Sequence, residues 1–294
     1  MSKKLNDISA KIDSNFIEIF QAMDEVIQKL GIQYFIIGAT ARDIILKYCH
    51  GITRNYRATQ DIDFGIQISN WDEFVSLKKS LLALDSFSED REKVHRLHFN
   101  ESIPIDLVPF GNIADDTDNL SWPPNHDIEM SVLGFEEAYE YSQLVRINKE
   151  PILDINFASL EGLFIMKLIA WKESRSRRLK DATDISIILD NYDSAEIQEI
   201  LFQDEKLLNA DDFDSSNAFA RILGRRVSKM AKTKTIETII EILDKEIDDK
   251  SNYQLARDMG DRTRFSNQVE TNIILLNNVR QGISDIINMQ IEGN

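Results

Sequence analysis

Two aspartates separated by a single residue stand inside an otherwise apolar segment, residues 60–64, which reads Gln-Asp-Ile-Asp-Phe. Side chains alternate along an extended strand, so Asp61 and Asp63 share one face and lie roughly 6.6 Å apart along the backbone. Two like charges on a largely buried strand are unfavourable unless a cation lies between them. Carboxylate oxygens are the ligands that Mg²⁺ and Mn²⁺ prefer. The pair therefore predicts a divalent-metal site.

A third carboxylate, Asp106, lies in the second of two strand-like runs, 94–99 and 103–108, which a three-residue turn joins into a predicted hairpin. Pro104 favours an edge position or the start of the strand. Together with Asp61 and Asp63, this side chain could hold two divalent ions about 3.5–4 Å apart, an arrangement that clamps the attacking and leaving oxygens of a phosphoryl transfer. Alternatively, Asp106 is an unrelated surface aspartate, because the chain has 50 acidic residues.

Upstream of these aspartates, the apolar run 34–37 predicts a central strand and leads into Gly38-Ala-Thr and then a helical segment. A glycine turn between a strand and a helix directs backbone amides toward the strand end, where proteins commonly bind phosphate. Taken alone, the turn is equally typical of an ordinary connection. The aspartates downstream favour phosphate binding.

The elements that must position these residues follow from hydrophobic spacing. Residues 8–30 predict an amphipathic helix, and Asn70 with Glu73 predicts the capped start of a helix that ends near residue 84. Residues 111–126 predict an irregular loop, and strands are expected near 144–147 and 152–155. From Leu160 onward the spacing is helical. We therefore predict an α/β domain over residues 1–157 and a helical domain over residues 158–294.

The first helix of the second domain is apolar nearly all round, yet it contains Lys167. This lysine either extends its ammonium to the surface or points toward a phosphate in a cleft between the domains. A basic run, 172–180, follows and leads to Asp181 and Asp184. Lys180 and Asp184 are also compatible with a simple i,i+4 helical pair.

A second basic patch lies further along the chain. Its members are Arg221, Arg225, Arg226, Lys229, Lys232 and Lys234. This patch is compatible with an RNA backbone, with an acidic protein partner or with no partner.

Composition limits the class of protein. With 294 residues, 43% of them hydrophobic, the chain can form a sizeable core. A formal net charge of −16 argues against non-specific coating of nucleic acid, which requires a cationic surface. The single cysteine, Cys49, excludes an internal disulfide, and no apolar run of about 18 residues predicts a membrane span. We expect a cytoplasmic protein without membrane association.

The segments 38–40, 59–64 and 105–107 resemble the motifs of polymerase-beta-like nucleotidyltransferases: a Gly-Gly or Gly-Ser turn, an Asp-x-Asp strand and a third strand carboxylate. The resemblance is closest to the AbiEii-type nucleotidyltransferase toxins. It implies a mixed β-sheet flanked by helices, a turn that holds a triphosphate, two metal-binding aspartates, Asp61 and Asp63, and an acceptor-activating Asp106. Ala39 stands at the second Gly or Ser position, so a hydroxyl contact would come from Thr40.

Two further matches extend the resemblance. The stretch 168–172, the arginines after it and the Lys-Asp-Ala-x-Asp run at 180–184 match an AbiEii-like motif. This match implies a nucleotide-binding Lys167 and functional Lys180, Asp181 and Asp184. The stretch 38–43 also resembles the Gly-Gly-x-Val-Arg-Asp turn of tRNA nucleotidyltransferases that add CCA ends, which favours an RNA acceptor. The expected nucleotide-binding residues are Gly38, Ala39, Thr40, Arg42, Lys180, Asp181 and Asp184, beside the catalytic Asp61, Asp63, Asp106 and Lys167.

The resemblance implies a metal-dependent nucleotidyltransferase that moves a nucleoside monophosphate from a nucleoside triphosphate (NTP) to a hydroxyl acceptor, with two Mg²⁺ or Mn²⁺ ions. The expected acceptor is RNA or tRNA, as for a toxin with a cognate antitoxin. Two alternatives remain open. One is an enzyme that modifies a small molecule or a protein hydroxyl, and the other is a nucleotide-binding module without turnover.

Overall fold

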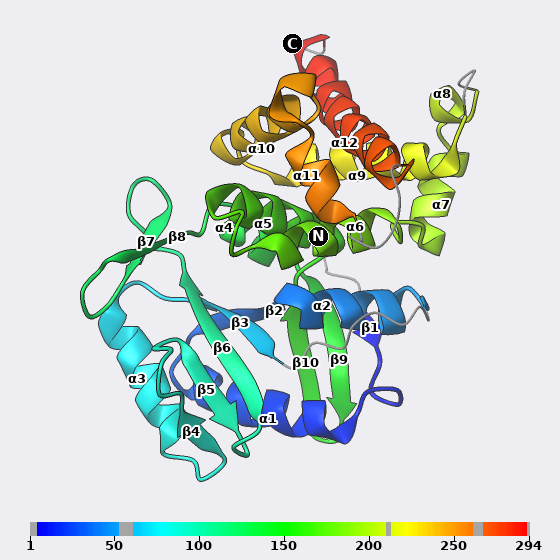
Figure 1. The fold of residues 1–294 in the computed structure, drawn as a ribbon. Coiled ribbons are helices and arrows are strands. Elements are labelled where there is room, and N and C mark those ends of the chain that lie inside the picture. The colour runs from blue at the N-terminus through cyan, green and yellow to red at the C-terminus, as the bar shows by residue number, and fades with distance from the viewer. Residues whose placement is uncertain (1–4, 53–60, 210–212, 261–266, 293–294) are drawn as a thin grey trace. The chain divides into compact units, whose positions relative to one another are not determined.

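The computed structural model describes residues 5–52, 61–209, 213–260 and 267–292 (Figure 1). The chain forms two compact units, Met1–Ser159 and Leu160–Asn294. The expected domain boundary, between residues 157 and 158, lies two residues before this division. The segment 53–60, which contains Arg54, Arg57 and the first motif residues, Thr59 and Gln60, lies outside the described residues.

The first unit is built on a mixed eight-stranded sheet with the order β1-β9-β10-β2-β3-β6-β5-β4. Its strands are β1 (Leu5–Asp7), β2 (Gln33–Ile37), β3 (Ile62–Gln67), β4 (Phe87–Glu89), β5 (Arg96–Phe99), β6 (Ile103–Phe110), β9 (Gln143–Lys149) and β10 (Ile152–Phe157). The β3–β6 pair is parallel and the β2–β3 pair is antiparallel. The predicted mixed α/β fold of this half is therefore confirmed.

Helices cover this sheet on both faces (Figure 1). They are α1 (Ser14–Lys29), α2 (Gly38–Ile44), α3 (Trp71–Leu82) and α4 (Phe135–Glu140), and a π-helical turn, Ile45–Cys49, follows α2. On one face the Phe20 ring of α1 lies 6.1 Å from that of Phe64 in β3. Because side chains alternate, Asp63 projects from the opposite face. On that opposite face, Phe35 contacts Tyr139 of α4 at 5.5 Å.

Capping side chains set the helix starts. Asn70 accepts a hydrogen bond from the Glu73 amide at 3.0 Å, which confirms the predicted cap of α3. The first helix begins at Ser14 rather than near Ile8, because Asp13 caps it by accepting from the Asn15 amide at 2.9 Å. Residues 8–13 instead form a turn, and the strand before them, β1, pairs in parallel with β9.

The predicted hairpin is confirmed, with β5 and β6 antiparallel around residues 100–102. The expectation of an irregular loop over residues 111–126 is wrong in part, because a small hairpin forms from β7 (Asn119–Trp122) and β8 (Ile128–Ser131). Before β7 lies an acidic run of Asp115, Asp116 and Asp118. Asp115 organises a turn there by accepting from the Thr117 and Asn119 amides at 2.8 and 3.0 Å. Trp122 then packs 5.3 Å from Trp71. The acidic run therefore forms an ordered turn that leads into β7.

The second unit is entirely helical where the structure describes it, as predicted. Its α-helices are α5 (Leu160–Glu173), α6 (Leu179–Leu189), α7 (Ala195–Phe202), α8 (Glu205–Leu208), α9 (Ser215–Met230), α10 (Thr233–Glu246), α11 (Gln254–Met259) and α12 (Asn267–Glu292). The first of them, α5, is buried over most of its surface. A search of the described helices finds no candidate for a membrane span.

Helices α9 and α12 approach at two glycines. A Cβ on Gly224 would lie 2.0 Å from the Val279 carbonyl oxygen, and one on Gly282 would lie 2.0 Å from the Arg221 carbonyl oxygen. Only glycine permits backbones this close.

We expect Gly224→Ala to lower the free energy of unfolding by about 1–3 kcal/mol, the usual cost of overpacking a close contact. Lys229→Ala on the exposed surface of the same helix serves as the control, and thermal unfolding measures both. Equal melting temperatures for the two variants would contradict the close approach.

Candidate active site

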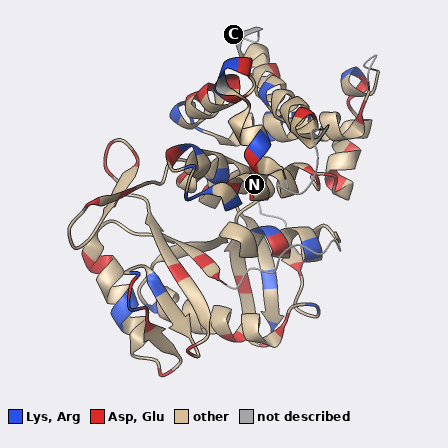
Figure 2. Cartoon of the chain, in the orientation of Figure 1, with Lys and Arg blue, Asp and Glu red and all other residues tan. Residues whose placement is uncertain are grey.

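Two of the predicted metal ligands are direct neighbours in the sheet. Asp63 of β3 pairs in register with Asp106 of β6, and both are half-buried. Register partners on parallel strands project from the same face, here called the carboxylate face. Figure 2 shows acidic positions on β3 and β6 beside a basic position on β5. The strands therefore place like charges side by side.

The basic side chain on β5 is Arg96, which pairs in register with Asp106. Its Nε and Nη2 atoms each donate to one Asp106 oxygen at 2.6 Å, a bidentate contact. The same Nη2 lies 3.4 Å from Oδ2 of Asp61. One guanidinium thus bridges two of the three predicted ligands.

Our sequence reasoning missed Arg96, although a signal was present. Counting back from the three-residue turn 100–102 places Arg96 opposite Asp106 in the hairpin. The hydrogen bonds to Asp106 raise the pKa of Arg96 above its ordinary value, so the side chain stays charged at physiological pH. Its charge is therefore a permanent feature of this face.

The glycine turn lies against the carboxylates. Gly38 has φ +68°, and a Cβ there would lie 1.9 Å from Oδ2 of Asp63. The Thr40 hydroxyl donates to the Asp61 carbonyl at 2.9 Å, and this side chain is 2% exposed. Arg42 is buried and donates to Asp43 at 2.6 and 2.8 Å, while Ala39 is half-buried. Within the turn, Thr40 and Arg42 thus make contacts to the protein itself, and their predicted role toward a nucleotide stays a prediction.

We expect Gly38→Ala to cost about 1–2 kcal/mol for the left-handed backbone and, in addition, to displace the Asp63 carboxylate and lower activity. Gly31→Ala is a matched control, because Gly31 has φ +69° and a Cβ added there would meet no atom of the described residues within 4 Å. Both variants should lose similar stability in thermal unfolding. Equal catalytic activity of the two would contradict a role for the close contact with Asp63.

The carboxylates of Asp61, Asp63 and Asp106 are the kind of ligands that a divalent cation prefers, but Arg96 already contacts two of these side chains. Asp61, Asp63 and Asp106 supply carboxylate oxygens, the hard ligands of Mg²⁺. Asp61 and Asp106 already share one cationic group, so their carboxylates converge on a position for positive charge. Over the described ranges, however, no three Asp, Glu, His or Cys side chains are arranged to hold a metal ion as they stand. Arg96 holds both oxygens of Asp106 in this arrangement.

In the helical unit, Lys167 forms a cluster with Asp181 and Asp184. Its Nζ lies 2.7 Å from Oδ1 of Asp181 and 2.7 Å from Oδ2 of Asp184. The Lys167 side chain is 18% exposed. Burial by itself would lower the pKa of Lys167, but Asp184 and Asp181 outweigh it and hold the pKa above its ordinary value. Lys167 therefore carries a permanent charge held by two carboxylates.

The residues of the 178–184 stretch differ in their burial and in their partners. Asp181 is 5% exposed, and its Oδ2 atom is buried with no hydrogen-bond partner among the described residues. Arg178 lies 3.8 Å from that atom. Lys180 is exposed, whereas Asp181 and Asp184 both face the half-buried Lys167. The nucleotide-binding role of these residues stays a prediction.

The arginines of the second basic patch make ion pairs inside the helical unit. Arg221 and Arg225 both contact Asp285, at 2.8 and 2.6 Å. Arg226 lies 2.7 Å from Glu161 and 2.7 Å from Glu196. These contacts join α9 to α5, α7 and α12. The three arginines therefore help to hold the helices of the second unit together.

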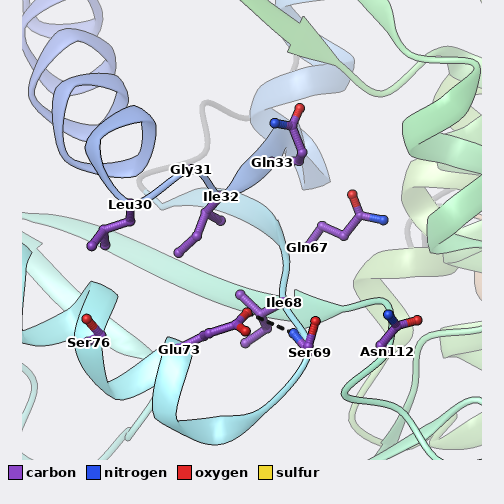
Figure 3. Close-up of a pocket in the computed structure, with 10 residues that line it drawn as sticks. All are labelled: Leu30, Gly31, Ile32, Gln33, Gln67, Ile68, Ser69, Glu73, Ser76 and Asn112. Atoms are coloured by element: carbon purple, nitrogen blue, oxygen red, sulfur yellow. Dashed lines mark hydrogen bonds between the residues drawn. The ribbon is translucent and has the colours of Figure 1, made fainter.

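A pocket of about 460 Å³ lies in the first unit at the other end of β2 and β3 (Figure 3). Gln33 and Gln67, which pair in register, stand at its rim, and the Glu73 carboxylate accepts from the Ser69 amide. Asp63 lies opposite Ile37, at the far end of the same strand pair. The pocket is therefore separate from Asp61, Asp63 and Asp106.

Comparison with known proteins places this chain in a family. A family model described as "Nucleotidyl transferase AbiEii toxin, Type IV TA system" matches residues 21–270. No curated protein matches the chain.

Several solved structures are similar at low identity. The antibiotic-resistance factor ANT(2'')-Ia shares 9% identity over 65% of this chain and 97% of its own, with a TM-score of 0.31. The Thermotoga maritima CCA-adding enzyme complexed with tRNA shares 9% over 94% of this chain and 83% of its own, with a TM-score of 0.32. A tRNA-processing enzyme shares 13% over 90% and 78%, with a TM-score of 0.34.

Proposed function

The chain belongs to the AbiEii nucleotidyltransferase family, and from this premise we propose that it transfers a nucleoside monophosphate from an NTP to a hydroxyl of RNA and releases pyrophosphate, with tRNA as the favoured acceptor. Nucleotidyl transfer is the activity of the family. The dependence on a divalent metal and the identity of the acceptor are our proposals.

One observation carries the proposal. Asp63 pairs in register with Asp106, and the Asp63 carboxylate lies against Gly38 at the start of α2. A nucleotidyltransferase requires carboxylates beside the place where the triphosphate lies, because positioning and charge stabilisation account for most of the catalysis. The glycine turn and the carboxylates meet here within one compact unit.

Asp61, Asp63 and Asp106 are the residues that would hold the metal. A bound divalent cation neutralises charge that develops on the transferred phosphoryl group. The chain's own contribution is to fix the carboxylates: the β3–β6 register sets Asp63 and Asp106 side by side, and Thr40 ties the backbone of Asp61 to α2. In this proposal Asp106 also accepts the proton of the acceptor hydroxyl.

The choice of RNA rests on the stretch 38–43, which resembles the glycine turn of CCA-adding enzymes, and on the toxin family. As partners we propose, beside the NTP and RNA, a cognate antitoxin. We propose that this protein and its antitoxin act in the cytoplasm.

The decisive experiment supplies each of the four α-³²P-labelled NTPs in turn, with Mg²⁺ and with total RNA, purified tRNA or total protein. We expect label in the tRNA band with one or two of the nucleotides, and none when EDTA is present. Asp63→Asn is the matched inactive control. Label in protein or in small molecules alone would overturn the RNA proposal, and labelling that survives EDTA would overturn the metal proposal.

A further inference from the structure

We infer that the Arg96 guanidinium takes the place of a metal ion on the carboxylate face. In the metal-free enzyme it supplies the positive charge between Asp61 and Asp106. It must release Asp106 before a divalent ion can bind there. The inference rests on the proposed function, since it concerns how the proposed metal site is filled.

The first step is geometric. Arg96 faces Asp106 directly across the β5–β6 pair, so its guanidinium reaches the carboxylate without leaving the sheet. Both of the donor distances are 2.6 Å, and both Asp106 oxygens are used. A guanidinium and a carboxylate that meet in this fork geometry form one of the stronger ion pairs in proteins. The pair is also sheltered, with 16% of the Arg96 side chain and 13% of the Asp106 side chain exposed.

The second step concerns charge. Asp106 is the neighbour of Asp63 in register, and Arg96 extends on to Asp61 at 3.4 Å. Carboxylates gathered on one face repel each other unless a cation lies among them. A guanidinium between Asp61 and Asp106 supplies that positive charge from within the chain.

The third step is competition. A divalent ion would use the same carboxylate oxygens that Arg96 now holds, and two cations cannot share this position. Metal entry therefore costs the energy of the Arg96 pair. We expect the ion to enter together with the NTP, whose phosphates add ligands for the metal and negative charge for the released guanidinium. Arg96 thereby links metal loading to nucleotide loading.

A second arginine pair in the same sheet provides a control. Arg146 of β9 faces Asp154 of β10 in register and contacts it at 2.7 and 2.8 Å. It has the same fork geometry, but it lies on the strand pair that is separated from β3 and β6 by β2.

The test compares wild-type protein with Arg96→Met and Arg146→Met, using Mn²⁺ alone as the probe and electron paramagnetic resonance to count free ions. In the absence of nucleotide we expect Arg96→Met to bind Mn²⁺ at least about tenfold more tightly than wild type, and Arg146→Met to bind like wild type. Both variants should melt at a lower temperature without metal, and Mn²⁺ should restore only Arg96→Met. If Arg96→Met does not fold, Arg96→Lys is used instead, because lysine keeps a positive charge but cannot make the bidentate contact with Asp106.

A parallel titration adds the non-hydrolysable α,β-methylene analogues of the four NTPs. If wild type binds Mn²⁺ with an analogue while Arg96→Met gains no affinity without one, the Arg96 inference is overturned and the metal proposal stands. If no variant binds Mn²⁺ under any condition, both are overturned. Tighter nucleotide-free binding in Arg96→Met alone supports both.

Discussion

Replacing Asp63 by asparagine is expected to lower the rate of nucleotidyl transfer by at least about a thousandfold, which corresponds to about 4 kcal/mol of transition-state stabilisation. Asparagine keeps the size of the side chain but removes the negative charge that a metal requires. The variant should remain folded. Because Asp63 stands beside Asp106 in register, removing one of two neighbouring like charges should leave the metal-free melting temperature equal or higher.

A matched control comes from the turn between α3 and β4. Asp85 is exposed there, and Asp85→Asn should leave the transfer rate within about threefold of wild type, since surface changes away from a site have small effects. Rates are measured by single-turnover labelling at saturating NTP. An Asp63→Asn protein with more than a tenth of wild-type activity would contradict the assignment of Asp63 as a metal ligand.

The arrangement of Asp63, Asp106 and Arg96 in the first unit follows short-range patterns of the sequence. Alternation along 60–64 places both aspartates on one face, and the structure places Asp63 and Asp106 in register. The three-residue turn of the hairpin fixes which residue faces Asp106. Counting across that turn would have revealed Arg96 from the sequence alone. Arginine is most often a loop or surface residue, whereas the register makes Arg96 a partner of the third carboxylate.

The surroundings of Lys167 could not be predicted in the same way. Its carboxylate partners lie 14 and 17 positions along the chain, on α6, and the contacts depend on how α5 and α6 pack. Helical spacing shows which face of a helix is apolar, but it does not set the crossing of two helices to within hydrogen-bond distance. The apolar pattern of α5 alone predicts that methionine at position 167 would leave stability unchanged. The contacts of Lys167 predict the opposite, because methionine would leave two buried carboxylates facing each other.

The second large effect is therefore expected from Lys167→Met. Removing one partner from a buried ion pair typically costs about 3–5 kcal/mol, and here the two abandoned carboxylates also repel each other. If Lys167 contacts the triphosphate as well, the affinity for NTP should fall by a further factor that corresponds to roughly 1.5–3 kcal/mol, the range for hydrogen bonds to charged groups. Stability is measured by urea unfolding, and affinity by calorimetry on the folded fraction.

The two effects can be separated by removing the carboxylates together with the lysine. In Lys167→Met with Asp181→Asn and Asp184→Asn no buried charge is left unpaired, so much of the stability should return while nucleotide affinity stays low. Arg226→Met, which breaks the contact with Glu161 in the same unit, should lose stability but retain affinity. A triple variant that regains both stability and wild-type affinity would show that Lys167 serves only to neutralise Asp181 and Asp184. In that case the phosphate-binding assignment would pass to Lys172 or Lys180, which are both exposed.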